Sequence, residues 1–267
     1  MITSHARRED SNGIVTVTFT RDEKLNAVSP EMYALIAEAV DDLAKRDDLR
    51  VLVITGEGRY FTAGNDIASM GDDIGRGSDG VLRGSIMRWQ YREVAHHDLF
   101  DEIERVEKPV ILAPQSHCFG VGVEMGLSCD FRLASDTATF SLPEVRNLAT
   151  VPGSGGISRL TRTIGPHWAR WLAMAGQTVD AQQALAIGLV HAVYPAAEFQ
   201  ARVQVFAQDL AGQPGEAIGL AKVAIQLADE LDRRSAREFD RIAQSLVLMS
   251  PEFQQRIAAF NARSKRT

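Results

Sequence analysis

Hydrophobic and polar residues alternate near the start of the chain and then follow a helical spacing. In residues 13–20, valine and phenylalanine alternate with threonine, which predicts a strand with one buried face. After a loop, Ser29 and Pro30 are suited to begin a helix, and apolar residues continue at helical spacing as far as residue 43. Residues 51–56 form a short apolar run ending in glycine, which predicts a strand covered on both faces. The chain therefore opens as strand, helix, strand.

The middle of the chain repeats this change of pattern. Residues 71–84 are rich in glycine and aspartate, which predicts a mobile surface loop, and residues 86–106 read as a long helix. Residues 180–187 predict a further helix, closed by Gly188. Short apolar runs predict three more strands, over residues 109–113, 131–134 and 189–193.

From Glu198 onward the pattern is helical, with interruptions at residues 212–215 and 250–251. No internal repeat divides the chain. We therefore expect an α/β core over residues 1–195 that carries the functional site, followed by a helical region over residues 196–267.

Composition narrows the class of protein. The chain has 267 residues, of which 45% are hydrophobic and 24% charged, as in a globular protein. It carries 29 Lys and Arg against 35 Asp and Glu, a net charge of -6 with no basic run, so nucleic acid is not an expected partner. No apolar segment suits a signal peptide or a membrane span, so we expect a cytoplasmic protein. Cys118 and Cys129 are expected to be reduced thiols.

A glycine-rich segment is the first candidate for chemistry. Residues 119–126 read Phe-Gly-Val-Gly-Val-Glu-Met-Gly, between an expected strand and an expected helix. Unpaired N–H groups at such a helix start can bind an oxyanion or a phosphate. The spacing GxGxxxG only weakly resembles a dinucleotide fingerprint. The glycines also fit a purely structural role, in which they allow a helix to pack closely on a strand.

Two acidic residues are the second candidate. Glu124 lies inside an otherwise apolar run, a costly place for a carboxylate unless it is paired, hydrogen-bonded or functional. Glu144 follows Pro143 in an expected loop, 144 − 124 = 20 residues later. Two carboxylates that converge on one water molecule can divide the acid and base roles between them. The segment 61–67, taken alone, predicts only a turn.

Other reactive side chains do not suggest a site. His96 and His97 are adjacent on an expected helix and face different directions, so no metal site is expected there. Ser154 lacks the GxSxG pattern of a serine hydrolase.

Taken together, these segments resemble the enoyl-CoA hydratase/isomerase, or crotonase, superfamily over nearly the whole chain. The resemblance implies a spiral of ββα units and a C-terminal helical region that drives trimerisation, giving a homotrimer or a homohexamer. The motifs that carry it are Lys24-Leu25-Asn26-Ala27, Phe61-Thr62-Ala63-Gly64-Asn65-Asp66-Ile67, Gly120-Val121-Gly122-Val123-Glu124 with Cys129-Asp130, Pro143-Glu144, Pro152-Gly153-Ser154-Gly155-Gly156 and Gly188-Leu189-Val190.

The resemblance also implies roles for individual residues. The backbone N–H groups of Asn65 and Val121 match the oxyanion hole for a thioester carbonyl, and Glu124 and Glu144 match the two catalytic glutamates. The loop at residues 71–84 would border the acyl pocket. Coenzyme A would enter only as part of the substrate, with no separate cofactor and no metal. The residues that match the substrate and CoA site are Lys24, Leu25, Ala63, Asp66, Ile67 and Gly122, with Phe260 and Lys265 from the tail.

Because both glutamates are present, the resemblance favours an enoyl-CoA hydratase, which adds water syn to a trans-2-enoyl-CoA thioester. The alternatives are an enoyl- or dienoyl-CoA isomerase, an acyl-CoA hydrolase, or a catalytically weak protein that binds CoA thioesters. Two departures from the hydratase pattern bear on substrate choice. Val121 replaces the usual glycine, and residues 144–152 are one residue longer than expected. Arg146 is an alternative ion-pair partner for a glutamate.

Overall fold

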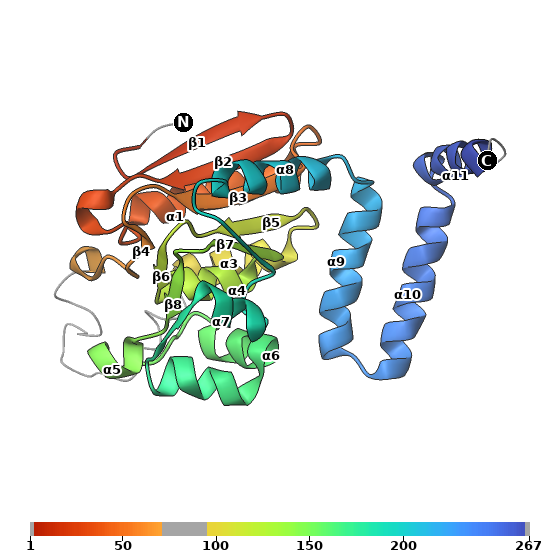
Figure 1. Cartoon of the computed structure of the whole chain (residues 1–267). Coiled ribbons are helices and arrows are strands. Elements are labelled where there is room, and N and C mark those ends of the chain that lie inside the picture. The colour runs from red at the N-terminus through yellow and green to blue at the C-terminus, as the bar shows by residue number, and fades with distance from the viewer. Residues whose placement is uncertain (1–2, 71–94, 265–267) are drawn as a thin grey trace, which may run out of the picture. The chain divides into compact units, whose positions relative to one another are not determined.

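The structure is a computed structural model that describes residues 3–70 and 95–264. Six strands form the larger of its two sheets. The strand order is β1-β2-β3-β5-β7-β10 (Figure 1). β1 runs antiparallel to β2, and every other neighbouring pair is parallel. The strands are β1 (Ala6–Ser11), β2 (Ile14–Phe19), β3 (Val51–Gly56), β5 (Val110–Ala113), β7 (Phe131–Ser135) and β10 (Ala192–Tyr194).

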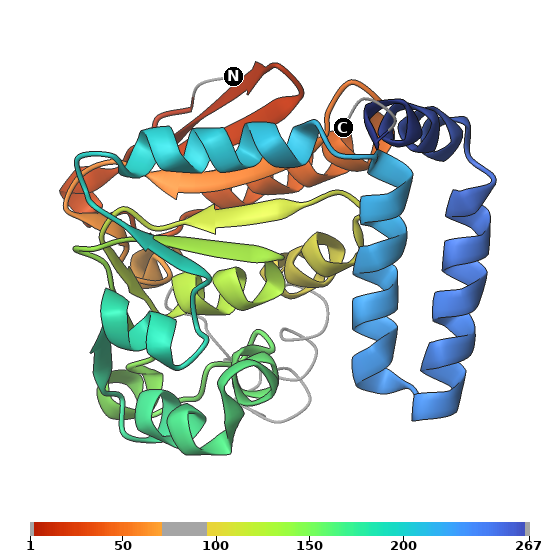
Figure 2. The ribbon, with the colours of Figure 1, turned by 45° about the vertical axis from the view of Figure 1, so that its right-hand side comes forward.

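Helices cover both faces of this sheet, and the apolar runs of the sequence reflect that burial. Every residue of β3 and β5 is buried, as expected for parallel strands between helical layers. Helix α1 (Pro30–Lys45) packs six buried apolar side chains inward, and the Ser29 hydroxyl accepts the N–H of Met32 at its start. Helix α8 (Phe199–Ala211) crosses the opposite face (Figure 2).

Four very short strands form a second sheet in the order β4-β6-β8-β9. β4, β6 and β8 run parallel to one another, and β9 closes the sheet antiparallel to β8. Each has only three residues, too few for an alternating pattern to be visible in the sequence. The strands are β4 (Tyr60–Thr62), β6 (His117–Phe119), β8 (Thr139–Ser141) and β9 (Thr178–Asp180).

The chain visits the two sheets in turn. Each of β3, β5 and β7 in the large sheet leads to β4, β6 and β8 in the small one, and helices return the chain to the large sheet. This confirms the predicted α/β spiral of ββα units. The connecting helices are η1 (Asp22–Lys24), η2 (Ile67–Met70), α3 (Ala95–Arg105), α4 (Val121–Ser128), α5 (Glu144–Leu148), α6 (Gly156–Ala169), the π-helix η3 (Arg170–Met174) and α7 (Ala181–Ala186).

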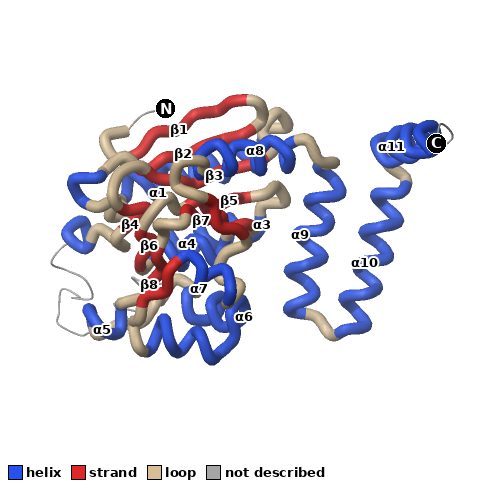
Figure 3. The backbone as a smooth tube through the Cα atoms, viewed as in Figure 1, coloured by secondary structure: helices blue, strands red, loops and turns tan. Residues whose placement is uncertain are grey.

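The structure divides into two compact units, Met1–Leu210 and Ala211–Thr267. The second unit is helical: α9 (Gly215–Glu230) and α10 (Arg233–Leu248) lie side by side and antiparallel, and α11 (Pro251–Ser264) follows (Figure 3). The predicted domain boundary after residue 195 falls earlier in the chain than this division and remains a prediction. The same holds for trimerisation.

Most predicted elements are present; two differences lie in the core and a third lies in the C-terminal helical unit. Glu144 was expected in a loop and is instead the first residue of α5. The strand expected at 189–193 is found at Ala192–Tyr194. A helix break not predicted from the sequence lies at Leu231, before Asp232 caps α10 through the N–H groups of its first turn. The expected loop at 71–84 and the start of the helix at 86–106 lie outside the described residues.

A fully buried asparagine holds together the loops that lead to the small sheet. The Asn26 amide donates to the carbonyls of Glu57 and Tyr60 at 2.8 and 2.7 Å, and its oxygen accepts the N–H of Arg21 at 2.7 Å. The Asn26 carbonyl in turn accepts the Thr62 hydroxyl at 2.7 Å. Every polar atom of this side chain is therefore paired, as burial requires.

We expect Asn26→Ala to lower the free energy of unfolding by about 3 kcal/mol, because it leaves two carbonyls and one N–H without their partner. Urea unfolding followed by circular dichroism measures this. Asn12→Ala is the matched control, since Asn12 is exposed and shares a backbone φ of 52° with Asn26. Equal losses in the two variants would attribute the effect to backbone conformation and contradict the role of the hydrogen bonds.

Candidate active site

Two backbone N–H groups lie where adjacent parallel strands of the small sheet end. Asn65 follows β4 and forms an isolated parallel bridge with Val28. That bridge uses the Val28 N–H, 2.8 Å from the Gly64 carbonyl, and the Asp66 N–H, 3.0 Å from the Val28 carbonyl. Since successive N–H groups of an extended segment point to opposite sides, the Asn65 N–H points away from Val28.

The second N–H belongs to Val121, the first residue of α4, which directly follows β6. N–H groups of the first helical turn have no partner within the helix. Among the residues that the structure describes, neither the Asn65 nor the Val121 N–H donates a hydrogen bond. The Val121 side chain is buried in the core, so any role of this residue in binding falls to its backbone N–H.

The segments that contain Asn65 and Val121 approach each other at Gly64 and Gly120, next to the carboxyl group of Glu144. Gly120, at a φ of +56°, lies so close to its neighbours that a Cβ atom there would be 3.5 Å from the Cα of Gly64. The same Cβ would be 2.9 Å from Oε1 of Glu144. Asn65, Val121 and Glu144 therefore gather at one edge of the small sheet, where β4, β6 and β8 end.

Glu144 reaches this point from the start of α5, and its carboxyl group is poorly solvated. Its Oε2 atom is buried, and no hydrogen-bond partner for it is found among the described residues. Burial raises the pKa of Glu144 above its ordinary value. Arg146, weighed from the sequence as an ion-pair partner, lies against Gly176, and no ion pair of Arg146 is found within the described part of the chain.

Glu124 is buried in the first turn of α4 and is only 4% exposed. Its Oε1 atom accepts the Ser154 N–H at 2.8 Å, and the Gly156 N–H is a second donor. Burial raises the pKa of Glu124 to about 7; the negative charge of Glu144 acts in the same direction, and the two N–H donors oppose it. The two carboxyl groups therefore share one electrostatic environment.

Tyr33 of α1 belongs to this site and was missed in the sequence. Its hydroxyl donates a hydrogen bond to Oδ1 of Asn65, and its ring stacks on His96 of α3 with centroids 4.9 Å apart. Burial of the phenol raises its pKa well above 10, and the charge of Glu124 adds to this effect. The helical pattern alone gives no sign of this role, because the partners of Tyr33 lie far along the chain.

The predicted substrate residues of the first unit fall into two groups. The Ala63 N–H donates to the Leu25 carbonyl at 3.0 Å, so their loops are adjacent, and Lys24 beside them is exposed. Ile67 is also exposed. Asp66 is instead ion-paired with Arg21 at 2.6 Å, a partner not predicted from the sequence.

Three other predicted substrate residues take different positions. Gly122 is buried in α4, where a Cβ would lie 2.3 Å from Cγ2 of Thr62, so its immediate role is close packing. Phe260 is exposed on α11 in the second unit. Lys265 lies outside the described residues. The substrate-binding roles of all these positions remain predictions.

Two further features concern the helices and the possible metal ligands of the described residues. None of their helices is both long and apolar enough to span a bilayer. Within the same residues, no three His, Cys, Asp or Glu side chains come together as potential metal ligands.

Comparison with known proteins identifies the family. Residues 9–266 match the family model described as enoyl-CoA hydratase/isomerase. The chain is 30% identical to the short-chain-enoyl-CoA hydratase of Clostridium acetobutylicum, covering 87% of this chain and 85% of that protein. It is 29% identical to the 4-chlorobenzoyl coenzyme A dehalogenase-2 of an Arthrobacter species, covering 98% and 92%.

A solved structure gives the same result for the fold. The enoyl-CoA hydratase of Bacillus anthracis superimposes with a TM-score of 0.85 at 26% identity, covering 97% of each chain. The spiral fold is therefore that of a family of enzymes whose members act on CoA thioesters. The chain belongs to the enoyl-CoA hydratase/isomerase family.

The shifted acidity of Glu124 predicts a change of stability with pH. A glutamate whose pKa is raised from 4.5 to about 7 on folding stabilises the fold below pH 4.5, and this contribution is lost as pH rises through 7. Glu124→Gln removes the charge, so its free energy of unfolding should rise relative to the parent protein between pH 5 and pH 8, by up to about 3 kcal/mol.

Urea unfolding at the two pH values measures the difference. Glu107→Gln, at an exposed position of the same unit, is the control and should show little change. A stability difference between Glu124→Gln and the parent that is independent of pH would show that Glu124 is not held in a proton-retaining environment.

Proposed function

We propose that this chain is an enoyl-CoA hydratase that adds water reversibly and syn across the double bond of a trans-2-enoyl-CoA thioester. The observation that supports it most is the proximity of two carboxyl groups, the buried Glu124 and the partly buried Glu144, to each other and to two backbone N–H groups without a described partner. Each feature answers one requirement of the reaction.

The first requirement is to stabilise negative charge on the thioester oxygen. Water adds to the β-carbon only if the developing enolate is stabilised, and we assign this role to the N–H groups of Asn65 and Val121, which donate no hydrogen bond among the described residues. Preorganised donors of this kind contribute about 3 kcal/mol each to the stability of the transition state. Because they are backbone groups, the valine side chain at position 121 does not prevent the role.

The second requirement is a base and an acid on the same side of the substrate. We assign Glu124 as the base: burial raises its pKa to about 7, but its two N–H donors oppose this rise, so the carboxylate is available at neutral pH. It takes a proton from water as the water oxygen bonds to the β-carbon. Glu144 is the acid, because its unpaired buried oxygen favours the protonated form, and it delivers its proton to the α-carbon. Exchange with solvent restores both groups.

The remaining parts of the proposal follow the family. CoA would lie along the loops of Lys24, Leu25 and Ala63, and the reaction would need no cofactor beyond the CoA of its own substrate. Asp66, Ile67, Gly122, Phe260 and Lys265 complete the proposed binding set. We also propose a cytoplasmic homotrimer or homohexamer.

Other reactions of the family are tested by the same assay. A relative of similar identity is a dehalogenase of 4-chlorobenzoyl-CoA, and another, the 1,2-epoxyphenylacetyl-CoA isomerase of Escherichia coli, is 30% identical. The substrates to be assayed should therefore include 4-chlorobenzoyl-CoA and 1,2-epoxyphenylacetyl-CoA as well as enoyl-CoAs. Product analysis by mass spectrometry separates hydration from isomerisation, thioester hydrolysis and dehalogenation.

We expect the protein to hydrate crotonyl-CoA or longer enoyl-CoAs, measured as loss of the conjugated absorbance. Glu124→Gln and Glu144→Gln should each lower kcat by about a hundred-fold or more and leave KM nearly unchanged, because the N–H groups remain. Glu107→Gln serves again as control. Absence of turnover at every chain length would refute hydration. Full activity of both variants would refute the catalytic roles of the two glutamates, and a very low turnover that neither variant changes would indicate a protein that only binds CoA thioesters.

The pH dependence of kcat/KM provides a separate test. If Glu124 must be ionised to act as the base, kcat/KM should rise with pH and level off above about 7, the pKa to which burial raises this group. Steady-state assays from pH 5 to 9 measure the profile. A profile that stays flat between pH 6 and 8 would contradict the assignment of Glu124 as the base.

A further inference from the structure

The turn formed by Ser154, Gly155 and Gly156 lies between Glu124 and an arginine that the reaction does not use. On one side, the Ser154 N–H donates to Oε1 of Glu124 at 2.8 Å. On the other side, Nη1 of Arg159 donates to the Ser154 carbonyl at 2.8 Å. The same residue thus binds the catalytic carboxylate through its N–H and the guanidinium through its carbonyl.

The two glycines of the turn leave no free space on either side. A Cβ at Gly155, which has a φ of +78°, would lie 2.1 Å from Nη1 of Arg159. A Cβ at Gly156 would lie 2.5 Å from Oε1 of Glu124. The guanidinium of Arg159 and the carboxyl group of Glu124 therefore both pack directly against the turn.

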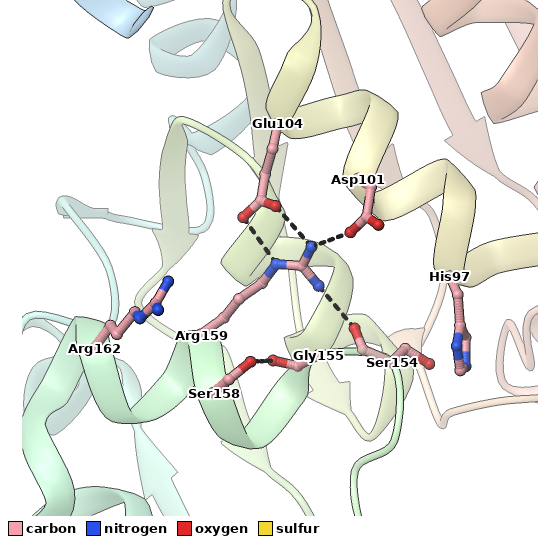
Figure 4. Close-up of a pocket in the computed structure, with 8 residues that line it drawn as sticks. All are labelled: His97, Asp101, Glu104, Ser154, Gly155, Ser158, Arg159 and Arg162. Carbon is pink, nitrogen blue, oxygen red and sulfur yellow. Dashed lines mark hydrogen bonds and ion pairs between the residues drawn. The ribbon is translucent and has the colours of Figure 1, made fainter. Parts of the chain in front are cut away.

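Arg159 is itself held in place by helix α3. Its Nε and Nη2 atoms donate to the two carboxylate oxygens of Glu104 at 2.8 and 2.7 Å, and Nη2 also donates to Asp101 at 2.7 Å (Figure 4). The Arg159 side chain is only 14% exposed. A cavity of about 290 Å³ opens beside it, between α3, α6 and the turn. Only a planar fork of donors makes all these bonds together.

We propose that Arg159 is a positioning residue for Glu124: its guanidinium fixes the Ser154–Gly156 turn to helix α3, so that the N–H groups of the turn meet the catalytic carboxylate. The attachment of the turn to α3 follows from the hydrogen bonds of Arg159 to Ser154 and Glu104. Its effect on catalysis rests on the proposed function.

The charged and titratable groups around Glu124 decide which substitution is informative. Glu144 on α5 and Tyr33 on α1 face it, and Arg159 on α6 supplies the positive charge. That charge lowers the pKa of Glu124 through space, so deleting it would mix a field effect with the loss of hydrogen bonds. Arg159→Lys keeps the charge and removes the fork, which isolates positioning.

In the full-length protein, we expect Arg159→Lys to lower kcat for enoyl-CoA hydration by about ten-fold, with KM changed less than about two-fold. The rising limb of the kcat pH profile should move to higher pH, because the N–H donors that stabilise the carboxylate are displaced. Arg105→Lys is the matched control: Arg105 is an exposed arginine on α3 paired with Glu102. Parent values of kcat and pH profile in Arg159→Lys would overturn the proposal.

A second variant covers the case in which Arg159→Lys does not fold, as judged by its thermal unfolding. Glu104→Gln keeps the guanidinium but weakens its anchor on α3, so it should move the pH profile in the same direction by a smaller amount. If Glu104→Gln shows no movement of the profile, the proposal is overturned.

A titration that needs no turnover separates this proposal from the proposed function. Protein labelled with ¹³C at the glutamate carboxyl group gives a signal for Glu124, assigned by its loss in Glu124→Gln. The midpoint of its titration should rise in Arg159→Lys and stay unchanged in Arg105→Lys. A raised midpoint in a protein without hydratase activity would support positioning and refute the function. An unchanged midpoint in an active hydratase would support the proposed function and refute the positioning role of Arg159.

Discussion

Burial of the Glu124 carboxyl group is the constraint on which the rest of the site depends. A carboxylate inside an apolar helix is costly unless donors replace the water it has lost. Here the donors are backbone N–H groups of a turn that is distant in sequence, and the turn contains two glycines because it is pressed between Glu124 and Arg159. The requirement to satisfy one buried acid thus determines the start of α6 and its attachment to α3.

The small sheet determines where the other groups of the site meet. Its three parallel strands end at one edge, and the chain leaves that edge through Asn65, Val121 and Glu144 in turn. Backbone register, rather than side-chain flexibility, therefore sets the distance between the N–H groups and the acid. Sites mounted on strand ends hold such distances better than sites on long loops.

The sequence predicted the elements with a clear hydrophobic period. The strands near residues 13–20 and 51–56 and the helix that Ser29 begins are all present, because their patterns are long enough to be read. The small sheet was not predicted, since three-residue strands carry no period. Glu144 was assigned to a loop because the five-residue helix that it begins is also too short to show a helical pattern.

In the candidate site, too, only residues with a local signal in the sequence could be predicted. Glu124 was identified because a carboxyl group in an apolar run has few harmless explanations. Arg21, Tyr33 and Arg159 were not, because each acts through a partner 30 or more residues away, and tyrosine or arginine on an amphipathic helix is unremarkable in sequence. Long-range polar pairing has no local signature, so the structure was needed to find it.

The contact between Gly120 and Glu144 links two positions that lie far apart in the gene. A Cβ atom at position 120 would lie 2.9 Å from Oε1 of Glu144, and the backbone φ of +56° also disfavours a side chain there. A descendant that exchanged Glu144 for a smaller residue would lose this contact, but the positive φ would still favour glycine at position 120. Among related enzymes, glycine at the position of Gly120 should therefore persist where the glutamate has been lost, because the backbone conformation requires it independently of the carboxyl group.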